Sequence, residues 1–287
     1  MNTSSLEDTR FILKKYNIKA NKKLGQNFLI DDNVINNTIG AAELSKNSLV
    51  IEIGPGLGTL TTKLLEQAGK VIAVELDERM VKILNDRFSL YDNFTLINDD
   101  ILKVNLKEII SENLKEFSEV KIVANLPYYI TTPIIMRLLE ERLNIDSIIV
   151  MVQKEVADRI TAEPGDKLSG AITYSVNYYA EPEKIQFVDK SSFIPAPEVD
   201  SEVIRLKIRK EPPVELEDEE LFFKIIKASF MQRRKTLKNG LSNSGLIQDK
   251  NILTKIFDEL GLDEGVRGEK LTLEQFAKLS NLISKTL

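Results

Sequence analysis

The chain has 287 residues, a formal net charge of −5, and neither cysteine nor histidine. This composition excludes disulfides, thiolate and histidine metal sites, cysteine nucleophiles and serine–histidine triads, so no metal site is expected. Hydrophobic residues make up 43% and charged residues 29%, which is typical of a globular protein with one large or two modest domains.

Two features of the apolar pattern concern localisation. The first ten residues lack the charged start and apolar core of a signal peptide. The longest apolar run, residues 148–152, is too short to cross a membrane. A cytoplasmic protein without a membrane partner is therefore expected.

Strand and helix patterns alternate through the first half of the chain. Residues 6–19 show a weak helical pattern, residues 22–29 are predicted to form a loop, and Asp32 is expected to cap the next helix. Short buried runs predict strands at 49–53, 71–75, 94–97, 121–124 and 147–152. Helices are predicted at 59–67, from the cap Asp77 to about 88, near 106–114, and from Pro133 to 141. This alternation predicts an α/β fold with a parallel, doubly wound sheet.

The second half of the chain is less regular. After a predicted helix at 153–161 and a loop at 163–166, residues 172–179 are compatible with helix or strand. An antiparallel pair is predicted at 184–188 and 201–208, joined by a proline-stiffened loop at 192–200. A linker at 210–213 precedes a helical pattern over 218–287. We therefore expect a catalytic domain over 1–209 and a small helical domain over 210–287.

Four polar or glycine-rich features follow predicted strands. They are the GxGxG loop at 54–58, Glu75, Asp100 and Asn125. In a doubly wound sheet, ligands bind at the carboxyl ends of the strands. The four features are therefore expected at one edge of the sheet, and together they indicate a ligand site.

The glycine loop and the two acids favour an adenosine-containing cofactor. Glu75 lies 21 positions after Gly54, a separation at which an acid at a strand end reaches ribose hydroxyls. The loop is shorter than the GxGxxG loop of dinucleotide binders, which favours S-adenosylmethionine over a nicotinamide cofactor. Asp100 could accept a hydrogen bond from the adenine amino group. Taken singly, either acid is more often a helix cap or a solvated side chain.

The Asn125-Leu126-Pro127-Tyr128 stretch suits a flat, aminated ring. Pro127 stiffens the backbone, the Asn125 amide oxygen and the Leu126 carbonyl can accept the two N–H bonds of an adenine amino group, and Tyr128 can stack on the base. Phe193 could cover the other face of the base. The alternative for this tetrapeptide alone is a strand-end turn with a surface tyrosine.

Basic residues gather in two places despite the negative net charge. The candidate RNA contacts are Lys22, Lys23, Arg233, Arg234, Lys235 and Lys238. Local basic clusters on an acidic protein fit phosphate contacts, although solvated helix faces are as common for any one cluster.

Seven motifs in this order resemble those of the bacterial small-subunit ribosomal RNA adenine dimethyltransferases, the kasugamycin-resistance methyltransferase family. They are GQNFL at 25–29, IEIGPGLGTLT at 51–61, VELD at 74–77, NDD at 98–100, NLPYY at 125–129, FIPAPEVDS at 193–201 and QRRKTLKN at 232–239. The resemblance covers nearly the whole chain. It implies a Rossmann-like class I S-adenosylmethionine-dependent methyltransferase sheet with a smaller C-terminal helical domain that binds rRNA.

The resemblance also implies the reaction and the site residues. The expected activity is dimethylation of N6 on two adjacent adenosines in a hairpin loop near the 3′ end of 16S rRNA, within the 30S particle or its precursor, with a role in small-subunit biogenesis. A monomer is expected. By motif match, the cofactor contacts would be Asn27, Leu29, Gly54, Glu75, Asp100 and Asn125. The base contacts would be Asn125, Leu126, Tyr128 and Phe193.

Two other functions remain open from the sequence. The macrolide-resistance branch methylates a large-subunit adenosine and resembles this chain throughout the sheet, but it usually has NIPY where this chain has NLPY. Leu126 and the long C-terminal region therefore favour the small-subunit branch. The second alternative is a ribosome-assembly factor whose binding matters more than its methylation.

Overall fold

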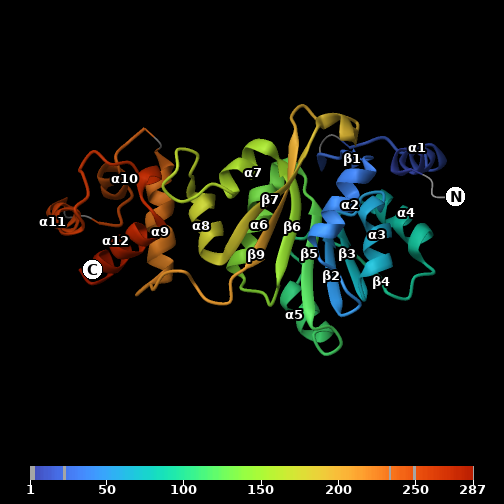
Figure 1. Ribbon diagram of the computed structural model, residues 1–287, viewed down its shortest axis with the longest axis horizontal. Helices are drawn as coiled ribbons and strands as arrows, with labels where there is room; N and C mark the ends of the chain where they lie inside the picture. The colour runs from blue at the N-terminus through green and yellow to red at the C-terminus, as the bar shows by residue number, and fades with distance from the viewer. Residues whose placement is uncertain (1–3, 22–23, 233, 248–249, 287) are drawn as a thin grey trace. The chain divides into compact units, whose positions relative to one another are not determined.

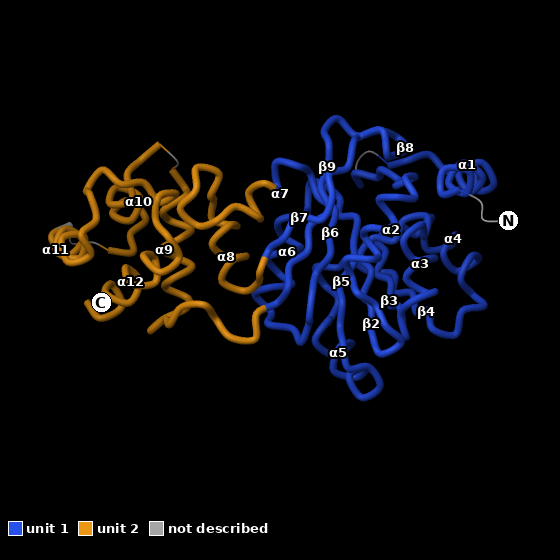
Figure 2. The backbone as a smooth tube through the Cα atoms, viewed as in Figure 1, with its two compact units in different colours: residues 1–157, 182–208 blue, residues 158–181, 209–287 orange. Residues whose placement is uncertain are grey.

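The computed structural model describes residues 4–21, 24–232, 234–247 and 250–286 (Figure 1). The chain forms two compact units, shown in different colours in Figure 2. The first unit comprises residues 1–157 and 182–208, and the second comprises residues 158–181 and 209–287. This division differs from the expected one at 209/210, because residues 158–181 group with the C-terminal helices. The cause is tertiary packing, because Tyr174 and Tyr178 are buried in the core of the second unit among residues of the C-terminal helices.

The first unit is built on a seven-stranded sheet with the order β4-β3-β2-β5-β6-β9-β7. The strands are β2 (Ser48–Ile53), β3 (Lys70–Glu75), β4 (Phe94–Asn98), β5 (Glu119–Asn125), β6 (Ser147–Gln153), β7 (Ala180–Val188) and β9 (Ser201–Ile208). The pairs β3·β4, β2·β3, β2·β5 and β5·β6 are parallel, which confirms the five predicted strands and the Rossmann-like fold class. The sheet is mixed rather than wholly parallel, because β9 pairs antiparallel with β6.

The helices up to residue 160 form at the predicted positions. They are α1 (Ser5–Lys15), α2 (Asp32–Ala41), α3 (Thr59–Gln67), α4 (Glu78–Phe88), α5 (Leu106–Asn113), α6 (Thr131–Glu140) and α7 (Lys154–Ile160). Buried residues of α2, α3 and α4 form one core cluster with Val50, Val71 and Val123 from the sheet. Asp77 caps α4 as predicted. The cap of α2 is Asp31 rather than the predicted Asp32, because Asp31 Oδ1 accepts the Asn33 and Val34 N–H groups.

A second, two-stranded sheet joins distant parts of the first unit. Strand β1 (Phe28–Leu29) pairs antiparallel with β8 (Phe193–Ile194), so that Phe28 opposes Ile194 and Leu29 opposes Phe193. The predicted loop at 22–29 is therefore wrong for its last two residues. The short 3-10 helix η3 (Lys190–Ser192) precedes β8. A two-residue strand has no periodicity of its own, so only its partner, far away in the chain, defines it.

The second unit is helical, as expected for the C-terminal region. Its helices are α8 (Ala171–Tyr179), α9 (Glu219–Met231), α10 (Leu237–Asn243), α11 (Lys250–Leu260) and α12 (Leu273–Ser284), with the 3-10 helix η4 (Gly268–Lys270). Tyr174 of α8 donates to the Leu271 carbonyl at 2.6 Å and packs on Phe276. Within the described ranges, no helix has the length and apolar character needed to cross a bilayer.

Candidate active site

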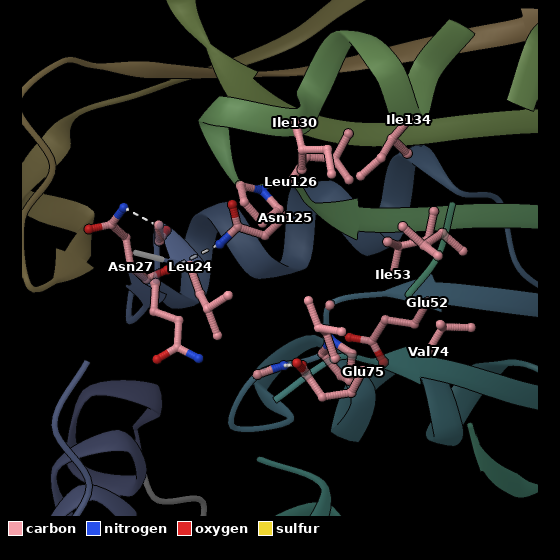
Figure 3. Close-up of a pocket in the computed structure, with 18 of the residues that line it drawn as sticks. Leu24, Asn27, Glu52, Ile53, Val74, Glu75, Asn125, Leu126, Ile130 and Ile134 are labelled. Atoms are coloured by element: carbon pink, nitrogen blue, oxygen red, sulfur yellow. Dashed lines mark hydrogen bonds between the residues drawn. The ribbon is translucent and has the colours of Figure 1, made fainter. Parts of the chain in front are cut away.

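A cavity opens at the carboxyl ends of the parallel strands of the first unit (Figure 3). Side chains from the ends of β2, β3 and β5 line it, together with the turn after β4, the turn after β5 and residues 24–29 of the N-terminal segment. The sequence-predicted residues in this lining are Asn27, Leu29, Gly54, Glu75, Asp100, Asn125, Leu126 and Tyr128. The cavity lies beside the point where strand order reverses, between β2 and β5, which is the usual ligand position in this architecture.

The glycine loop between β2 and α3 gives the cavity a wall of backbone. Gly54 has φ +65° and no atom lies within 4 Å of the position that a Cβ would occupy, so a ligand can approach its backbone closely. Gly58 has φ +85°, and a Cβ there would lie 2.5 Å from Cε2 of Phe88. The loop therefore requires glycine at Gly58 both for its backbone angle and for its packing on α4.

Glu75 holds the glycine loop against the end of β3. One carboxylate oxygen, Oε2, accepts the Gly56 N–H at 3.1 Å, and the other, Oε1, accepts the Asp77 N–H at 2.8 Å. The side chain is buried, and this burial raises the pKa of the Glu75 carboxyl despite the two backbone bonds. Each carboxylate oxygen has a second lone pair, so Glu75 can still accept hydrogen bonds from a ligand.

Asp100 lies in the turn after β4, and this turn is tied to helix α6. Asp100 Oδ1 accepts the Leu102 N–H at 3.0 Å. Arg137 of α6 donates through Nη2 to the Val104 carbonyl at 2.7 Å and through Nη1 to the Ile101 carbonyl. The same helix supplies Ile134 to the cavity lining. The turn is therefore held at both ends, which keeps Asp100 at the rim.

Asn125 connects the end of β5 with the N-terminal segment. Its Nδ2 donates to the Asn27 carbonyl at 3.3 Å, as the dashed line in Figure 3 shows. Because that partner is an acceptor, the other end of the amide must be the carbonyl oxygen Oδ1. The next residue, Leu126, is bound to the sheet by its N–H, which donates to the Met151 carbonyl at 3.2 Å.

Tyr128 begins the 3-10 helix η2 (Tyr128–Ile130), which follows Pro127 directly. Pro127 has φ −59° and ψ 132°, and its carbonyl accepts from the Ile130 N–H and the Thr131 hydroxyl. The Tyr128 hydroxyl lies 2.7 Å from Ser201 Oγ at the start of β9, and burial raises the pKa of the Tyr128 phenol. Bonds at both ends of the turn thus fix the ring at the cavity wall.

Phe193 is the predicted base contact that the structure does not bring into the cavity. Its side chain is 3% exposed and belongs to the core cluster of the first unit, opposite Leu29 in the two-stranded sheet. Phe193 packs beside β1, whose residues line the cavity, and its contact with the target base stays a prediction. Ser201, the last residue of the FIPAPEVDS motif, contacts the cavity residue Tyr128 through its hydroxyl.

Glu52 lines the cavity but is not among the site residues predicted from the sequence. It is 1% exposed, accepts the Thr61 hydroxyl at 2.6 Å, and lies near Glu75. Burial raises the pKa of this carboxyl to about 8, and the negative charge of Glu75 adds to the shift. An acid inside an otherwise apolar strand is the signal that could have revealed it, because a buried carboxyl needs a partner or a proton.

The basic residues fall into three groups. Lys22, Lys23 and Arg233 lie outside the described residues. Arg234 and Lys235 are exposed in the second unit, between α9 and α10. Lys238 differs, because its ammonium group donates to Thr254 Oγ1 at 2.9 Å and pairs with Glu264, and its side chain is largely buried.

Comparisons with known proteins agree with this geometry. A family model described as ribosomal RNA adenine dimethylase matches residues 17–285. Proteins called ribosomal RNA small subunit methyltransferase A from Bacillus mycoides and Bacillus cereus are each 48% identical over 277 residues, covering 96% of this chain and 95% of theirs.

Solved structures agree as well. A dimethyladenosine transferase from Plasmodium falciparum is 26% identical with a TM-score of 0.74, covering 88% of this chain and 95% of its own. The 23S rRNA methyltransferase ErmE is also 26% identical, with a TM-score of 0.67, covering 90% of this chain and all of its own. The chain belongs to the ribosomal RNA adenine dimethylase family.

Proposed function

We propose that this protein transfers methyl groups from S-adenosylmethionine to N6 of two adjacent adenosines in a hairpin loop near the 3′ end of 16S rRNA. The observation that carries the proposal is the meeting of Glu75, Asp100 and Asn125–Tyr128 in one cavity beside the glycine loop. Membership in the ribosomal RNA adenine dimethylase family supports the same reaction. The substrate would be the rRNA within the 30S particle or its precursor, as part of small-subunit biogenesis.

The cavity residues fit an adenosine-containing methyl donor. The open space above Gly54 leaves room for a ligand against the backbone, and Glu75 offers free lone pairs to ribose hydroxyls. Asp100 at the rim can accept from the adenine amino group, while Asn27 and Leu29 close the N-terminal side. The cofactor, when bound, supplies an electrophilic methyl group on a positively charged sulfur.

The target base requires a different set of residues. The lone pair of an adenine amino group is delocalised into the ring, so the nitrogen is a poor nucleophile. Asn125 Oδ1 and the Leu126 carbonyl can accept its two N–H bonds, which favours a pyramidal nitrogen with its lone pair free to react. Tyr128 offers a fixed ring on which the base can stack after leaving the RNA stack.

The small-subunit substrate is favoured over a large-subunit one. The relatives called small subunit methyltransferase A are 48% identical, whereas the 23S rRNA methyltransferase ErmE is 26% identical. Leu126 in the NLPY sequence points the same way. The second unit, with exposed Arg234 and Lys235, is the proposed rRNA-binding domain, and we infer a cytoplasmic monomer.

Incorporation of radioactive methyl groups into under-methylated 30S particles tests the proposal. We expect wild-type protein to add two methyl groups to each of two neighbouring adenosines, which nucleotide mapping of the rRNA would locate. Under-methylated 50S particles are assayed in parallel, and incorporation into their 23S rRNA without incorporation into 30S particles would instead assign the protein to the macrolide-resistance type of activity.

An Asn125→Ala variant is the control for this experiment, because it removes the amide that donates to the Asn27 carbonyl and that, in our proposal, accepts from the target base. It should bind 30S particles as the wild type does while its methyl transfer falls steeply. Binding of wild-type protein without any methyl incorporation would leave only a role in assembly.

A further inference from the structure

Two tyrosines stand side by side at the cavity, and they differ in their surroundings. Tyr128 is half-buried with its hydroxyl on Ser201, whereas Tyr129 is 58% exposed. Both belong to the 3-10 helix η2, where three residues complete a turn, so neighbouring side chains point about 120° apart. The two rings therefore cannot lie on the same base.

The ring of Tyr129 has a defined place at the rim. A Cβ built on Gly25 would lie 3.6 Å from Cδ1 and 3.8 Å from Cε1 of Tyr129, so the ring passes close to the Gly25 backbone. Gly25 has φ +63°, a backbone angle that residues other than glycine rarely adopt. Pro127, which precedes the two tyrosines, lies against the same glycine, since its Cβ would be 3.5 Å from the Cβ built on Gly25. The turn that carries Tyr129 therefore packs on the Gly25 backbone.

Exposure sets Tyr129 apart from the other aromatic residues of the cavity lining. Of the three aromatic side chains in the lining, Phe28 is buried and Tyr128 is half-buried, so Tyr129 is the one that presents its ring to solvent. An exposed aromatic ring beside a base-sized cavity is the arrangement that single-stranded RNA sites use for stacking.

We propose that Tyr129 forms a second base subsite, on which the nucleotide next to the target adenosine stacks. This inference rests on the proposed function, because it concerns the substrate of the same site. When the target base leaves the RNA stack, its neighbour loses a stacking partner, and the Tyr129 ring replaces that partner at the cavity rim. Stacking of this kind tolerates any base, so the subsite adds affinity rather than sequence preference.

The test uses a hairpin RNA whose loop carries two adjacent adenosines, with the fluorescent base 2-aminopurine at one of two places. One probe replaces the target adenosine and the other replaces its neighbour. Binding is measured with S-adenosylhomocysteine present, so that no turnover is needed. Wild-type protein should change the fluorescence of both probes.

The tyrosine variants should then separate the two probes. Tyr129→Ala should abolish the signal at the neighbouring base and weaken hairpin binding by roughly 5- to 100-fold, the range expected for one stacked base. The signal at the target base should remain. Tyr128→Ala should give the reverse pattern, and Tyr129→Phe should behave as wild type because it keeps the ring.

Tyr91→Ala is the matched control. Tyr91 is 42% exposed and lies just before β4, at the amino edge of the sheet and thus on the opposite side from the cavity. It should leave both signals unchanged. A Tyr129→Ala variant with a normal signal at the neighbouring base would overturn the subsite.

Two further outcomes are informative. If Tyr129→Ala weakens cofactor binding in calorimetry and leaves both fluorescence signals intact, Tyr129 only supports the loop at Gly25, and the subsite is overturned. Methyl transfer by wild-type protein to under-methylated 30S particles is measured in parallel. Its absence would refute the proposed function, while the fluorescence of the neighbouring base would still decide the role of Tyr129.

Discussion

Two carboxyl groups, Glu52 and Glu75, lie buried in the cavity, and their surroundings assign them different roles. Glu75 accepts two backbone N–H groups and keeps lone pairs for a ligand. Glu52 has one hydroxyl partner, Thr61, and lies deeper in the strand. Glu75 therefore remains our proposed ligand contact, whereas Glu52 is a buried acid whose charge depends on pH.

Replacing Glu75 with alanine should weaken S-adenosylmethionine binding by roughly ten- to hundredfold, because hydrogen bonds to a charged group contribute about 1.5–3 kcal/mol. Titration calorimetry measures the change. Glu75→Gln is the control, since it keeps an acceptor for the Gly56 or Asp77 N–H and should show a smaller loss. Unaltered affinity in the alanine variant would contradict contact with the ribose.

Glu52 should make the stability of the protein depend on pH. The pKa of its carboxyl is raised from 4.5 to about 8 in the folded state, so the folded protein holds a proton that the unfolded chain releases. The contribution of the Glu52 carboxyl to the free energy of unfolding is complete below pH 4.5. It is lost as the pH rises towards 8. The slope from this one group is at most about 1.4 kcal/mol per pH unit.

Chemical denaturation of wild-type and Glu52→Gln protein between pH 5 and pH 8 checks this expectation. Glutamine can still accept the Thr61 hydroxyl, but it has no proton to lose in this range. The variant should show a smaller fall in the free energy of unfolding as the pH rises. Parallel curves for the two proteins would mean that Glu52 is already ionised in the folded state.

At the scale of secondary-structure elements, the short sheet β1·β8 connects the GQNFL and FIPAPEVDS motifs. Leu29 and Phe193 oppose one another in it, although they lie far apart in the chain. This pairing places Asn27 where its carbonyl accepts from Asn125. The two motifs therefore meet through backbone pairing, and the cofactor side of the cavity depends on that pairing.

Phe193→Ala should lower the free energy of unfolding by about 3–5 kcal/mol, the usual cost of removing a buried aromatic ring. Denaturant unfolding measures this loss. Phe193→Leu should keep most of the stability and methylate RNA at close to the wild-type rate, because the ring lies in the core and not in the cavity. If the leucine variant is stable but transfers few methyl groups, Phe193 contacts the target base after all.

At the scale of the whole molecule, the cavity belongs to the first unit, whereas the exposed cations Arg234 and Lys235 belong to the second. Residues 158–181 belong with the C-terminal helices, so the chain passes between the units more than once. The helical unit has its own core, which includes Phe222, Phe257 and Phe276. Exposed cations in that unit can therefore be changed without altering the sheet that carries the cavity.

Replacing Arg234 and Lys235 together with alanine should reduce the slope of log affinity against log salt concentration by about 1.5, since each phosphate contact contributes roughly 0.7–0.9. Filter binding of 16S rRNA fragments over a range of salt concentrations measures the slope. Lys238→Ala is the contrasting variant, because Lys238 pairs with Glu264 and should affect thermal stability instead. If the double variant keeps the wild-type slope, Arg234 and Lys235 are solvated surface residues that do not contact phosphates.

Local patterns in the sequence are enough to predict the order of the elements and most of the residues that line the cavity. Strands 49–53, 71–75 and 121–124 are short apolar runs bounded by glycines, caps and prolines, so local chemistry was sufficient to find them. The rule that parallel strands end at one edge then brought Gly54, Glu75, Asp100 and Asn125 together. The assignment of Asn27 and Leu29 as cofactor contacts rests only on the resemblance to the methyltransferase family.

The remaining features become visible only in the folded chain, because each depends on contacts between residues that are distant in the sequence. The pairing of β1 with β8 buries Phe193, and packing by Tyr174 and Tyr178 moves residues 158–181 to the helical unit. Lys238, a predicted RNA contact, forms an ion pair with Glu264. Such contacts cannot be predicted from periodicity or from a motif. They arise from the desolvation and pairing of groups that meet only after the chain has folded.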